Sequence, residues 1–577
     1  MRRSSFNVVQ EMIGLVRPYR LTLLPVVFCL LVLSLCNLAM PFVLKYVINN
    51  VLFPARGAGS EARHLFTLLL YVLVIILVIY GLRNLLFYLS KTRVMLMGER
   101  IAFELRQRLI SHLHTLSVDF YQQNKPGKIS ARVMQDVQYI KEFIQDELAD
   151  MMVNVFMLLA AAAIMLYMRW SLALVTLAVL PFQVLVYYVF RKPISAYARE
   201  AKERTADVSG DLIEQLDGVA TVRASATHLI EQAKLGERMR RGMWAHIRQS
   251  TYYLFQKIAA DLLVGVGTIV LFGVGGYMVL YRGMEAGDFV AFYFYVGILY
   301  PRLIEVVSQA SKFSRTGSSV ERVREMLQIE PGVRESPQAL PHEITRGRIE
   351  FRNVTFSYQN GPVLQDVSFT IEPGEHVVLT GPSGAGKSTC VNLIPRFYDP
   401  QRGSILIDGI DVRDFTLTAL RRQVGFVLQD CFLFNDTVMA NIRYAWPEAS
   451  DEAVVEAARR AYAHEFIERL PHGYMTMIGE GGVQLSQGEK RRLMIARAIL
   501  KNPRILIMDE ALVSLDRHTR QQAVEGLHDL VKNRTVISVT HYPSEVPYAA
   551  KQIHLCDGKA TVRELSPRAA QTPQPSE

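Results

Sequence analysis

The sequence predicts two domains of different class: a helical domain that spans a membrane, followed by an α/β domain. At 577 residues the chain is too long for a single hydrophobic core. Its first 312 residues contain five windows of 18 or more residues without a charge, and crossing a bilayer takes ~20 residues of helix. Beyond residue 347, short β-like runs alternate with helical patterns. That alternation is typical of an α/β domain with a mostly parallel sheet.

The uncharged windows are residues 21–44, 65–82, 151–168, 170–190 and 262–281. A sixth candidate, residues 289–311, is interrupted by Arg302 and Glu305. A buried soluble helix is the alternative for any one window, but five neighbouring windows favour membrane spans. We therefore expect a transmembrane domain over residues 1–325, with spans near 21–44, 65–88, 151–168, 170–190, 258–281 and 289–311.

Basic residues predict how these spans are oriented. Ten Lys or Arg lie in residues 83–150 and twelve in residues 191–257, whereas the loops on the opposite side are short. Because cytosolic loops are enriched in Lys and Arg, the N-terminus is expected in the cytosol. The first apolar run follows Arg17 and Arg20 and exceeds the usual length of a signal peptide's apolar region, so we expect an uncleaved first span. Six spans return the chain to the cytosol, which predicts a multi-pass protein of a bacterial inner membrane with both termini cytosolic.

The net charge of +10 does not require nucleic acid as a partner. Much of the basic excess lies beside the predicted spans, where anionic lipid headgroups attract it. Membrane lipids are therefore the expected partners, and nucleic acid is not. The five cysteines form no C-x-x-C pattern, which predicts reduced thiols with no role as metal ligands.

Two segments on the cytosolic side, residues 98–116 and 196–216, have the pattern of charged amphipathic helices continuous with their spans. Each reaches a break, at residues 124–127 and 217–218, so we expect two stalks that can contact a soluble domain. Residues 326–347 contain three prolines and no long apolar run, which predicts a linker. The α/β domain is then expected over residues 348–566, followed by a disordered tail at 567–577. Its β-like runs are residues 349–356, 367–371, 404–407, 425–428, 505–508 and 535–539.

A glycine-rich loop in the α/β domain matches the pattern G-x-x-x-x-G-K-[ST] without a mismatch. It consists of Gly381, Pro382, Ser383, Gly384, Ala385, Gly386, Lys387, Ser388 and Thr389. Glycines allow successive backbone N–H groups to face phosphate oxygens, and the following helix adds its positive N-terminal end. Lys387 can reach the β- and γ-phosphates, and the Ser388 hydroxyl can ligate Mg²⁺. An apolar run before the loop and a helical run after it complete the expected context, so the loop predicts binding of a nucleoside triphosphate.

Two acids at the end of a predicted buried strand indicate hydrolysis of that triphosphate. The apolar residues 505–508 are followed directly by Asp509 and Glu510. The carboxyl ends of parallel strands are where open α/β sheets bind ligands. We expect Asp509 to hold Mg²⁺ and Glu510 to orient and deprotonate the attacking water.

A third motif lies between these two and identifies a family. It reads Leu485-Ser486-Gln487-Gly488-Glu489-Lys490 and is followed by a helical run. With it, the chain resembles the ATP-binding cassette (ABC) transporters, in particular exporters of the multidrug or lipid type that fuse six spans to one cassette. The resemblance covers nearly the whole chain, including the stalk segments 120–127 and 218–224. It implies ATP-driven export of an amphipathic substrate (a lipid, a drug or a peptide-like molecule) from the cytosol or inner leaflet, with ATP and Mg²⁺ as cofactors.

The resemblance also implies roles for individual residues. The catalytic residues would be Glu510, His541 and Lys387. Nucleotide-binding residues would be Tyr358 (stacking on adenine), the loop from Gly381 to Thr389, and Gln429; the Mg²⁺ ligands would be Ser388, Gln429 and Asp509. Residues that contact ATP held by another cassette would be Ser486, Gly488, Glu489 and Asp516. Two cassettes would thus sandwich two ATPs, so the expected partner is a second half-transporter, with a second copy of this chain favoured and a different chain possible.

This chain departs from the family's usual text at three places, one of which is the loop Gly479-Glu480-Gly481-Gly482, where the arginine often found in the family at the position of Gly481 is missing. The family has L-S-G-G-Q where Gln487 and Glu489 occupy the third and fifth positions here. It has A-T-S-A-L-D where this chain reads Ala511-Leu512-Val513-Ser514-Leu515-Asp516. A carboxylate at Glu489 near a polyphosphate is unfavourable unless it points away or pairs with Lys490 or Arg491. Hydrolysis is expected to persist, and slow turnover and a different partner chain both stay open.

Four charged residues near the cytosolic ends of the predicted spans are candidates for the substrate path: Arg83, Asp261, Arg302 and Glu305. Charges at this depth usually face a bundle interior or a water-filled cavity. Arg302 and Glu305 are three residues apart and could pair on one helical face. Ion pairs that fix helix packing are the alternative. For the whole chain, import of metal chelates and a non-transporting channel or regulator gated by ATP remain open, and the sequence does not identify the cargo.

Overall fold

The structure is a computed structural model that describes residues 14, 17–52, 62–358, 361–427, 431–479, 481–509, 531–540, 546 and 549–565. The side chains of residues 62, 310, 311, 314 and 315 are not described. The predicted tail at 567–577 lies outside these residues. The chain divides into two compact units, one formed by residues 1–114 and 126–329 and the other by residues 115–125 and 330–577.

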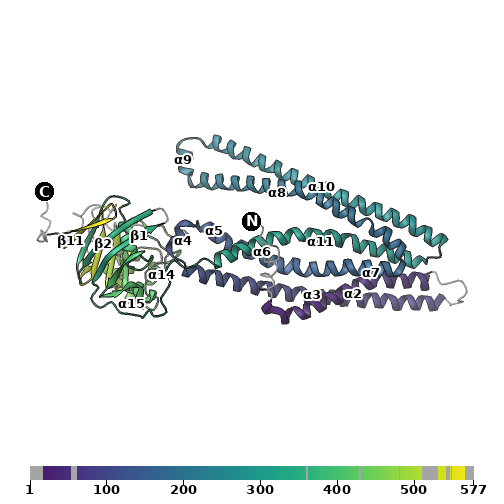
Figure 1. The fold of residues 1–577 in the computed structure, drawn as a ribbon, viewed down its shortest axis with the longest axis horizontal. Helices are drawn as coiled ribbons and strands as arrows, with labels where there is room; N and C mark the ends of the chain where they lie inside the picture. Colours follow the sequence, from purple (N-terminus) through teal and green to yellow (C-terminus); the bar gives the residue numbers. More distant parts are fainter. Residues whose placement is uncertain are drawn as a thin grey trace. The chain divides into compact units, whose positions relative to one another are not determined.

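The first unit is built from long helices that follow one another with short connections (Figure 1). The long helices are α2 (Arg20–Val47), α3 (Ala62–Thr115), α7 (Ala149–Leu177), α8 (Leu180–Asp217), α10 (His228–Tyr281) and α11 (Ala286–Leu327). Shorter helical segments are η1 (Arg17–Tyr19), η2 (Ile48–Leu52), α5 (Pro126–Ala131), η3 (Arg132–Asp136), α6 (Val137–Glu142), η4 (Phe143–Leu148) and α9 (Val219–Ala224). The long apolar runs of the sequence therefore form the helices that were expected.

Five helical stretches in the described residues are long and apolar enough to cross a membrane. They are Arg17–Leu52, Arg63–Thr115, Pro126–Asp217, His228–Tyr281 and Ala286–Gln309. The third stretch is 92 residues long and contains both the third and the fourth predicted spans. Within it Arg169 has non-helical angles (φ −155°, ψ 93°), at the position where the sequence predicts the turn between those spans.

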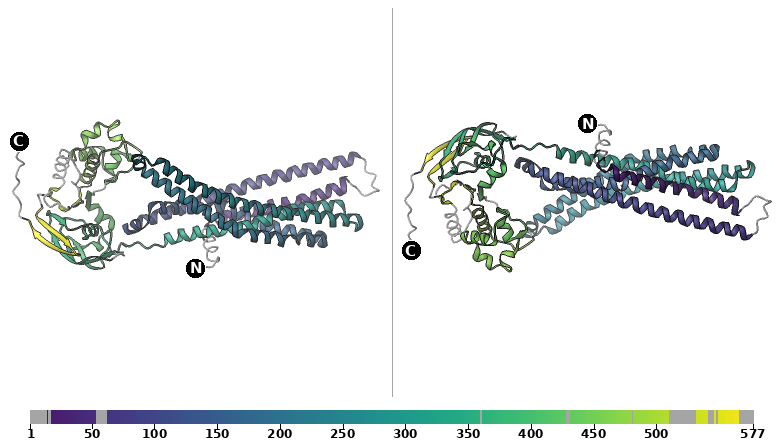
Figure 2. Two further views of the ribbon diagram at one scale, coloured as in Figure 1. Left: turned by 90° about the horizontal axis from the view of Figure 1, so that it is seen from above. Right: turned by 90° about the horizontal axis from the view of Figure 1, so that it is seen from below.

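Helices α8 and α10 pack side by side along much of their length (Figure 2). Tyr197 of α8 stacks on Tyr252 of α10, with ring centroids 5.2 Å apart. The predicted charged helix at 196–216 is the second half of α8, which ends at Asp217 where Gly218 follows. The prediction that the amphipathic helices continue from their spans is confirmed, because α3 and α8 each run without interruption into the charged segment.

The helices of the first unit contact closely where glycine or a buried hydroxyl allows it. A Cβ added at Gly267 of α10 would collide with the side chain of Tyr300 on α11. The Tyr300 hydroxyl donates to the backbone oxygen of Thr176 at 3.0 Å. Nearer the C-terminal end of α11, Arg322 forms a two-pronged ion pair with Asp136, whose carboxylate is buried. Polar contacts thus join α11 to α7 and η3, and the close approach at Gly267 joins α11 to α10.

The second unit contains two main sheets (Figure 1). The strands of the first are β1 (Ile349–Tyr358), β2 (Gly361–Ile371), β4 (Arg402–Ile407) and β5 (Ile410–Asp411), in the order β2-β1-β4-β5. The strands of the second are β3 (His376–Thr380), β6 (Val424–Val427), β9 (Ile505–Asp509), β10 (Thr535–Val539), β11 (Lys551–Cys556) and β12 (Lys559–Glu564), in the order β12-β11-β3-β10-β9-β6. A short third pair joins β7 (Asp436–Thr437) to β8 (Met477–Ile478).

The sequence-based expectation of one mostly parallel sheet needs correction. The predicted strands at 349–356, 367–371 and 404–407 pair antiparallel with one another in the first sheet. Only the second sheet is mainly parallel, with β12 as its antiparallel edge. Each sequence pattern predicts a strand but does not predict which strand pairs with it, because pairing depends on residues distant in sequence.

Helices complete the second unit. They are α4 (Val118–Gln123), α12 (Lys387–Leu393), α13 (Leu417–Gln423), α14 (Val438–Arg443), α15 (Asp451–Arg460), α16 (His464–Glu468) and α17 (Gln487–Lys501). Short 3₁₀ turns are η5 (Val412–Asp414) and η6 (Gly473–Met475). One hydrophobic core includes buried residues from both main sheets, and another lies between the parallel sheet and α14, α15 and α17.

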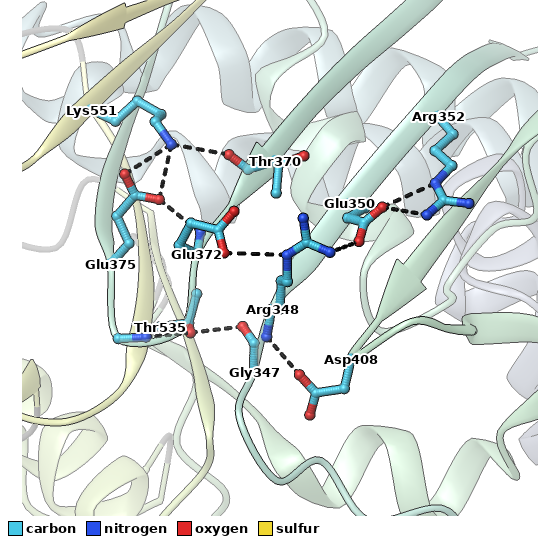
Figure 3. A network of polar contacts seen from close by, with 11 residues as sticks. Gly347, Arg348, Glu350, Arg352, Thr370, Glu372, Glu375, Asp408, Thr535 and Lys551 are labelled. Atoms are coloured by element: carbon cyan, nitrogen blue, oxygen red, sulfur yellow. Dashed lines mark hydrogen bonds and ion pairs between the residues drawn. The ribbon is translucent and has the colours of Figure 1, made fainter.

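A network of polar contacts ties the two main sheets together (Figure 3). The Thr535 hydroxyl, at the start of β10, donates to the Gly347 oxygen at 2.7 Å and accepts from the Gly374 N–H at 3.2 Å. Lys551 of β11 forms an ion pair with Glu375 (Nζ–Oε1 2.9 Å) just before β3. Because Glu375 and Gly374 lead directly into β3, the network fixes the start of the strand that carries the glycine-rich loop.

Candidate nucleotide-binding site

The glycine-rich loop follows β3, whose five residues are all buried. Gly381, Gly384 and Gly386 have φ values of 147°, 81° and 93°, a region that disfavours residues with a Cβ. Gly386 is the N-cap of α12, so the loop turns directly into the helix N-terminus. The structure thus confirms the expected strand, loop and helix, and this arrangement presents backbone N–H groups to an anion.

Lys387 lies in the first turn of α12 with its ammonium group folded over the loop. Its Nζ donates to the Gly381 oxygen at 2.8 Å and to the Pro382 oxygen at 2.9 Å. The side chain is only 8% exposed. An ammonium group in this position can bind the phosphates that such a loop binds. Its bond to a charged phosphate oxygen is stronger than its hydrogen bonds to neutral carbonyl oxygens.

Tyr358 lies at the end of β1 and contacts the same loop. Its hydroxyl accepts a hydrogen bond from Thr389 Oγ1 at 3.3 Å. Its ring forms edge-to-face contacts with Phe356 (4.8 Å between centroids) and Tyr398 (5.4 Å). The ring is half-buried, so one part stays accessible for stacking on a base. The structure therefore brings Tyr358 to the loop, as the predicted adenine contact requires.

Asp509 is the last residue of β9, two strands away from β3. In the parallel register, Asp509 is level with Val539 of β10, which is level with Leu379 of β3. With ~4.8 Å between neighbouring strands, the Asp509 backbone is roughly 10 Å from β3. Asp509 ends β9, and the loop that leads to Ser388 follows the carboxyl end of β3. A carboxylate and a hydroxyl are both hard oxygen donors, which Mg²⁺ prefers.

Burial keeps two titratable groups of the elements that flank the loop neutral, His376 of β3 and Cys390 of α12. His376 Nε2 lies 2.8 Å from the Ser538 hydroxyl, which joins β3 to β10. Burial lowers the pKa of His376 to about 4 and raises the pKa of the Cys390 thiol to about 12. All five cysteines are free thiols in the structure. These groups support the loop as packing residues and do not supply charge to it.

Ser486 is the N-cap of α17, and its side chain forms a capping box with Glu489. The Ser486 N–H and hydroxyl both donate to Glu489 Oε2 at 2.8 Å, and the Glu489 N–H donates to the Ser486 hydroxyl at 3.3 Å. The sequence leaves the direction of Glu489 open. The structure turns this carboxylate back onto the serine that the resemblance places against a γ-phosphate.

Four predicted site residues lie outside the described part of the chain: Gln429, Glu510, Asp516 and His541. Their roles as Mg²⁺ ligand, catalytic base, partner contact and γ-phosphate contact stay predictions. The described residues bring the loop, Tyr358 and Asp509 to one unit and place Ser486, Gly488 and Glu489 together at the start of α17.

The four candidate residues of the substrate path are spread over three helices. Arg83 of α3 donates to Asn37 Oδ1 at 3.4 Å, and Asp261 of α10 is exposed. Arg302 and Glu305 of α11 form the expected pair at 2.9 Å. Arg302 also donates to Asn154 of α7 at 2.7 Å, a contact that the sequence pattern does not reveal. Arg302 is therefore at least a link between two helices.

The segment that follows the first predicted stalk contacts the soluble domain, as expected. The segment 115–125, between α3 and α5, belongs to the second unit, and its helix α4 places Gln122 Oε1 3.5 Å from the Tyr398 hydroxyl. Tyr398 packs in turn against Tyr358. Burial raises the pKa of Tyr398 to about 12, so the phenol stays protonated. The sequence predicts contact of this segment with the soluble domain, but it does not predict that Gln122 and Tyr398 are the residues that meet.

Comparison with known proteins identifies the class of this chain. A family profile described as the ABC transporter transmembrane region matches residues 23–302, and one described as ABC transporter matches residues 364–513. "Putative multidrug export ATP-binding/permease protein YgaD" of Bacillus subtilis is 32% identical over 554 residues, covering 96% of this chain and 95% of that protein. A protein of Staphylococcus aureus with the same description is 33% identical over 564 residues, covering 97% of each.

A solved structure agrees with these matches. It is described as a bacterial Atm1-family ABC exporter with ATP bound, and it superposes with a TM-score of 0.79 at 27% identity over 94% of each chain. A helical membrane domain fused to a nucleotide-binding α/β domain defines an ABC exporter half-transporter. The chain belongs to the ABC transporter family. It is an integral membrane protein that binds ATP and couples ATP hydrolysis to export, in a family whose half-transporters generally dimerise.

Proposed function

We propose that two copies of this chain assemble so that their cassettes sandwich two ATP molecules. The observation that carries this proposal is that the phosphate-binding loop and the capped start of α17 are built on different elements of one cassette. The glycine-rich loop with Tyr358 and Asp509 forms one half, and the capped start of α17 forms the other. The first half presents groups that can bind phosphates, and a second cassette would supply donors opposite the γ-phosphate through Ser486 and Gly488, with Asp516 in the adjoining loop. Copurification of two differently tagged copies tests the homodimer against a different partner chain.

Within each site we assign hydrolysis to Lys387 of the loop and to Glu510 and His541, which follow β9 and β10 in the sequence. Lys387 binds the β- and γ-phosphates, and Glu510 orients the attacking water and accepts its proton. His541 contacts the γ-phosphate near that water. Ser388, Gln429 and Asp509 would hold Mg²⁺, which neutralises phosphate charge when it is bound.

We propose an amphipathic substrate, a lipid, drug or peptide-like molecule, which leaves the cytosol or inner leaflet of a bacterial inner membrane. The names of the bacterial relatives support this class of cargo, because they describe multidrug export. Helix α3 supports a lipid environment: its apolar window is only 6% buried within the chain. Both termini are placed in the cytosol by the charge distribution of the sequence.

Glu510→Gln is expected to lower ATP hydrolysis by about 100-fold or more, because an amide cannot accept the proton of the attacking water. The variant is expected to retain ATP and to hold the two cassettes closed. Hydrolysis of radiolabelled ATP and retention of unhydrolysed nucleotide after gel filtration measure both effects. A hydrolysis rate equal to that of the wild type would show that another residue is the base.

The direction of transport is tested in inside-out vesicles that contain the purified protein. ATP-driven accumulation of a fluorescent amphipathic probe inside the vesicles is the expected result for export. The Glu510→Gln variant is the matched control, because it keeps the membrane domain and stops turnover. ATP-driven loss of preloaded probe would contradict export, and hydrolysis without movement of a probe that stimulates it would contradict transport.

We further propose that Arg83, Asp261, Arg302 and Glu305 lie along the substrate path. The Arg302 side chain is 33% exposed while it contacts Asn154 and Glu305, so part of the guanidinium stays accessible. Arg302→Gln is expected to lower the ratio of substrate-stimulated to basal ATPase activity several-fold. The measurement is ATPase activity in proteoliposomes with and without a stimulating compound. If stimulated and basal rates fall by the same factor, Arg302 acts only as a link between α7 and α11.

A further inference from the structure

We propose that Glu489 is an internal competitor of ATP: its carboxylate occupies the anion site at the start of α17 that a γ-phosphate must take when two cassettes close. This inference rests on the proposed function, in which Ser486 faces ATP bound to the other copy. Glu489 would set the ATP concentration at which the two cassettes close.

The geometry places the carboxylate on the donors in question. Glu489 Oε2 lies 2.8 Å from both the N–H and the hydroxyl oxygen of Ser486. Ser486 and Gln487 are exposed, so this end of α17 is open to an incoming ligand. The carboxylate thereby takes the position of an anion at a helix N-terminus, where a negative charge is most favourable.

The donors at Ser486 cannot serve both anions fully. A serine hydroxyl carries one proton to donate, and phosphate oxygens accept but do not donate. While the hydroxyl and the N–H donate to Glu489, neither is available at full strength for a γ-phosphate oxygen. Two negative groups at one helix end also repel each other. Closure therefore requires Glu489 to turn away or to share the site at a cost.

A glutamine at this position would behave differently. Glutamine keeps a side-chain oxygen for the Ser486 N–H, so the capping box can still form. Glutamine carries no charge, so it accepts a weaker hydrogen bond from the Ser486 hydroxyl than glutamate does. It also does not repel the phosphate. The resemblance noted above gives glutamine at this position in the family's usual L-S-G-G-Q text, so Glu489→Gln replaces the carboxylate by the residue of that text.

The test is Glu489→Gln in the full-length protein that also carries Glu510→Gln, so that closed pairs accumulate. We expect the ATP concentration for half-maximal closure, measured by energy transfer between labels on the two cassettes, to fall roughly fivefold to tenfold. The difference in this ATP concentration between the Glu489→Gln protein and the protein that keeps Glu489 should shrink at high ionic strength, because salt screens charge repulsion at an exposed helix end. The midpoint of thermal unfolding should stay near that of the Glu489 protein, because the cap is retained.

The matched control is Glu452→Gln in the same background. Glu452 is the second residue of α15, whose N-cap is Ser450, so it places a carboxylate at a serine-capped helix start outside the proposed site. This control should leave the ATP requirement unchanged. Glu489→Ala removes both charge and cap, so it should lower the ATP requirement and also the stability of the cassette.

Equal ATP requirements for the Glu489 and Glu489→Gln proteins would overturn the inference and leave Glu489 as a helix cap. If the Glu510→Gln protein shows no ATP-dependent closure with either residue, the proposed two-cassette site itself fails, and the inference with it. Closure that occurs but does not respond to Glu489→Gln contradicts the competitor role alone.

Discussion

Lys387→Met is expected to lower ATP hydrolysis by at least about 100-fold, because a preorganised cation at the transferring phosphate is among the largest catalytic terms. Methionine is also long and unbranched, so it can fill the largely buried space beside α12. It cannot donate to the Gly381 and Pro382 oxygens, nor can it bind a phosphate. Steady-state ATPase activity of the purified protein and the affinity for a fluorescent ATP analogue are the measurements.

The matched control for this change is Lys559→Met. Lys559 is an exposed lysine of β12 in the same unit, so it tests whether loss of any lysine lowers activity. We expect its ATPase activity to remain within about twofold of the wild type, since surface changes away from a site have small effects. If Lys387→Met retained normal hydrolysis, the glycine-rich loop would not be the phosphate site.

The sequence predicts the parts of this fold whose causes are local. A membrane helix follows from a run of apolar residues, so the long helices lie where uncharged windows predict them. The glycine-rich loop follows from its own spacing, and the positive φ values of Gly381, Gly384 and Gly386 are a direct consequence of that spacing. The turn at Arg169 interrupts two apolar runs, and the backbone leaves the helical region at that residue.

Pairings between distant residues could not be predicted in the same way. Strands at 349–356 and 404–407 look like members of the parallel sheet, yet they form an antiparallel sheet because their partners are set by tertiary packing. The contact between Gln122 and Tyr398 joins residues 276 positions apart, and neither local pattern contains it.

The direction of Glu489 shows a different limit. The next two residues, Lys490 and Arg491, are cations, and the Glu489 carboxylate could pair with either of them or point into water. The N-cap geometry of Ser486 decides the outcome, because the first turn of α17 brings residue N3 back to the cap. A serine followed three residues later by glutamate is a known capping pattern, so this signal was present in the sequence and only its consequence for the phosphate site needed the structure.

Gly381→Ala is expected to abolish nucleotide binding and to destabilise the α/β domain by roughly 3 kcal/mol. A Cβ at Gly381 would lie well inside van der Waals distance of the Leu555 oxygen, which belongs to the backbone of β11. That strand pairs with β3 directly before the loop, so neither backbone can move without breaking the ladder. The φ of 147° adds strain for any residue with a Cβ.

Gly384→Ala in the same loop is the matched control. Gly384 also has a positive φ, of 81°, but nothing lies within 4 Å of a Cβ added there. The cost should therefore be limited to backbone strain of about 1 kcal/mol. Thermal unfolding of the full chain, together with binding of a fluorescent ATP analogue, compares the two variants. Equal effects of the two substitutions would mean that backbone conformation alone governs the loop and that the close approach of β11 does not constrain it.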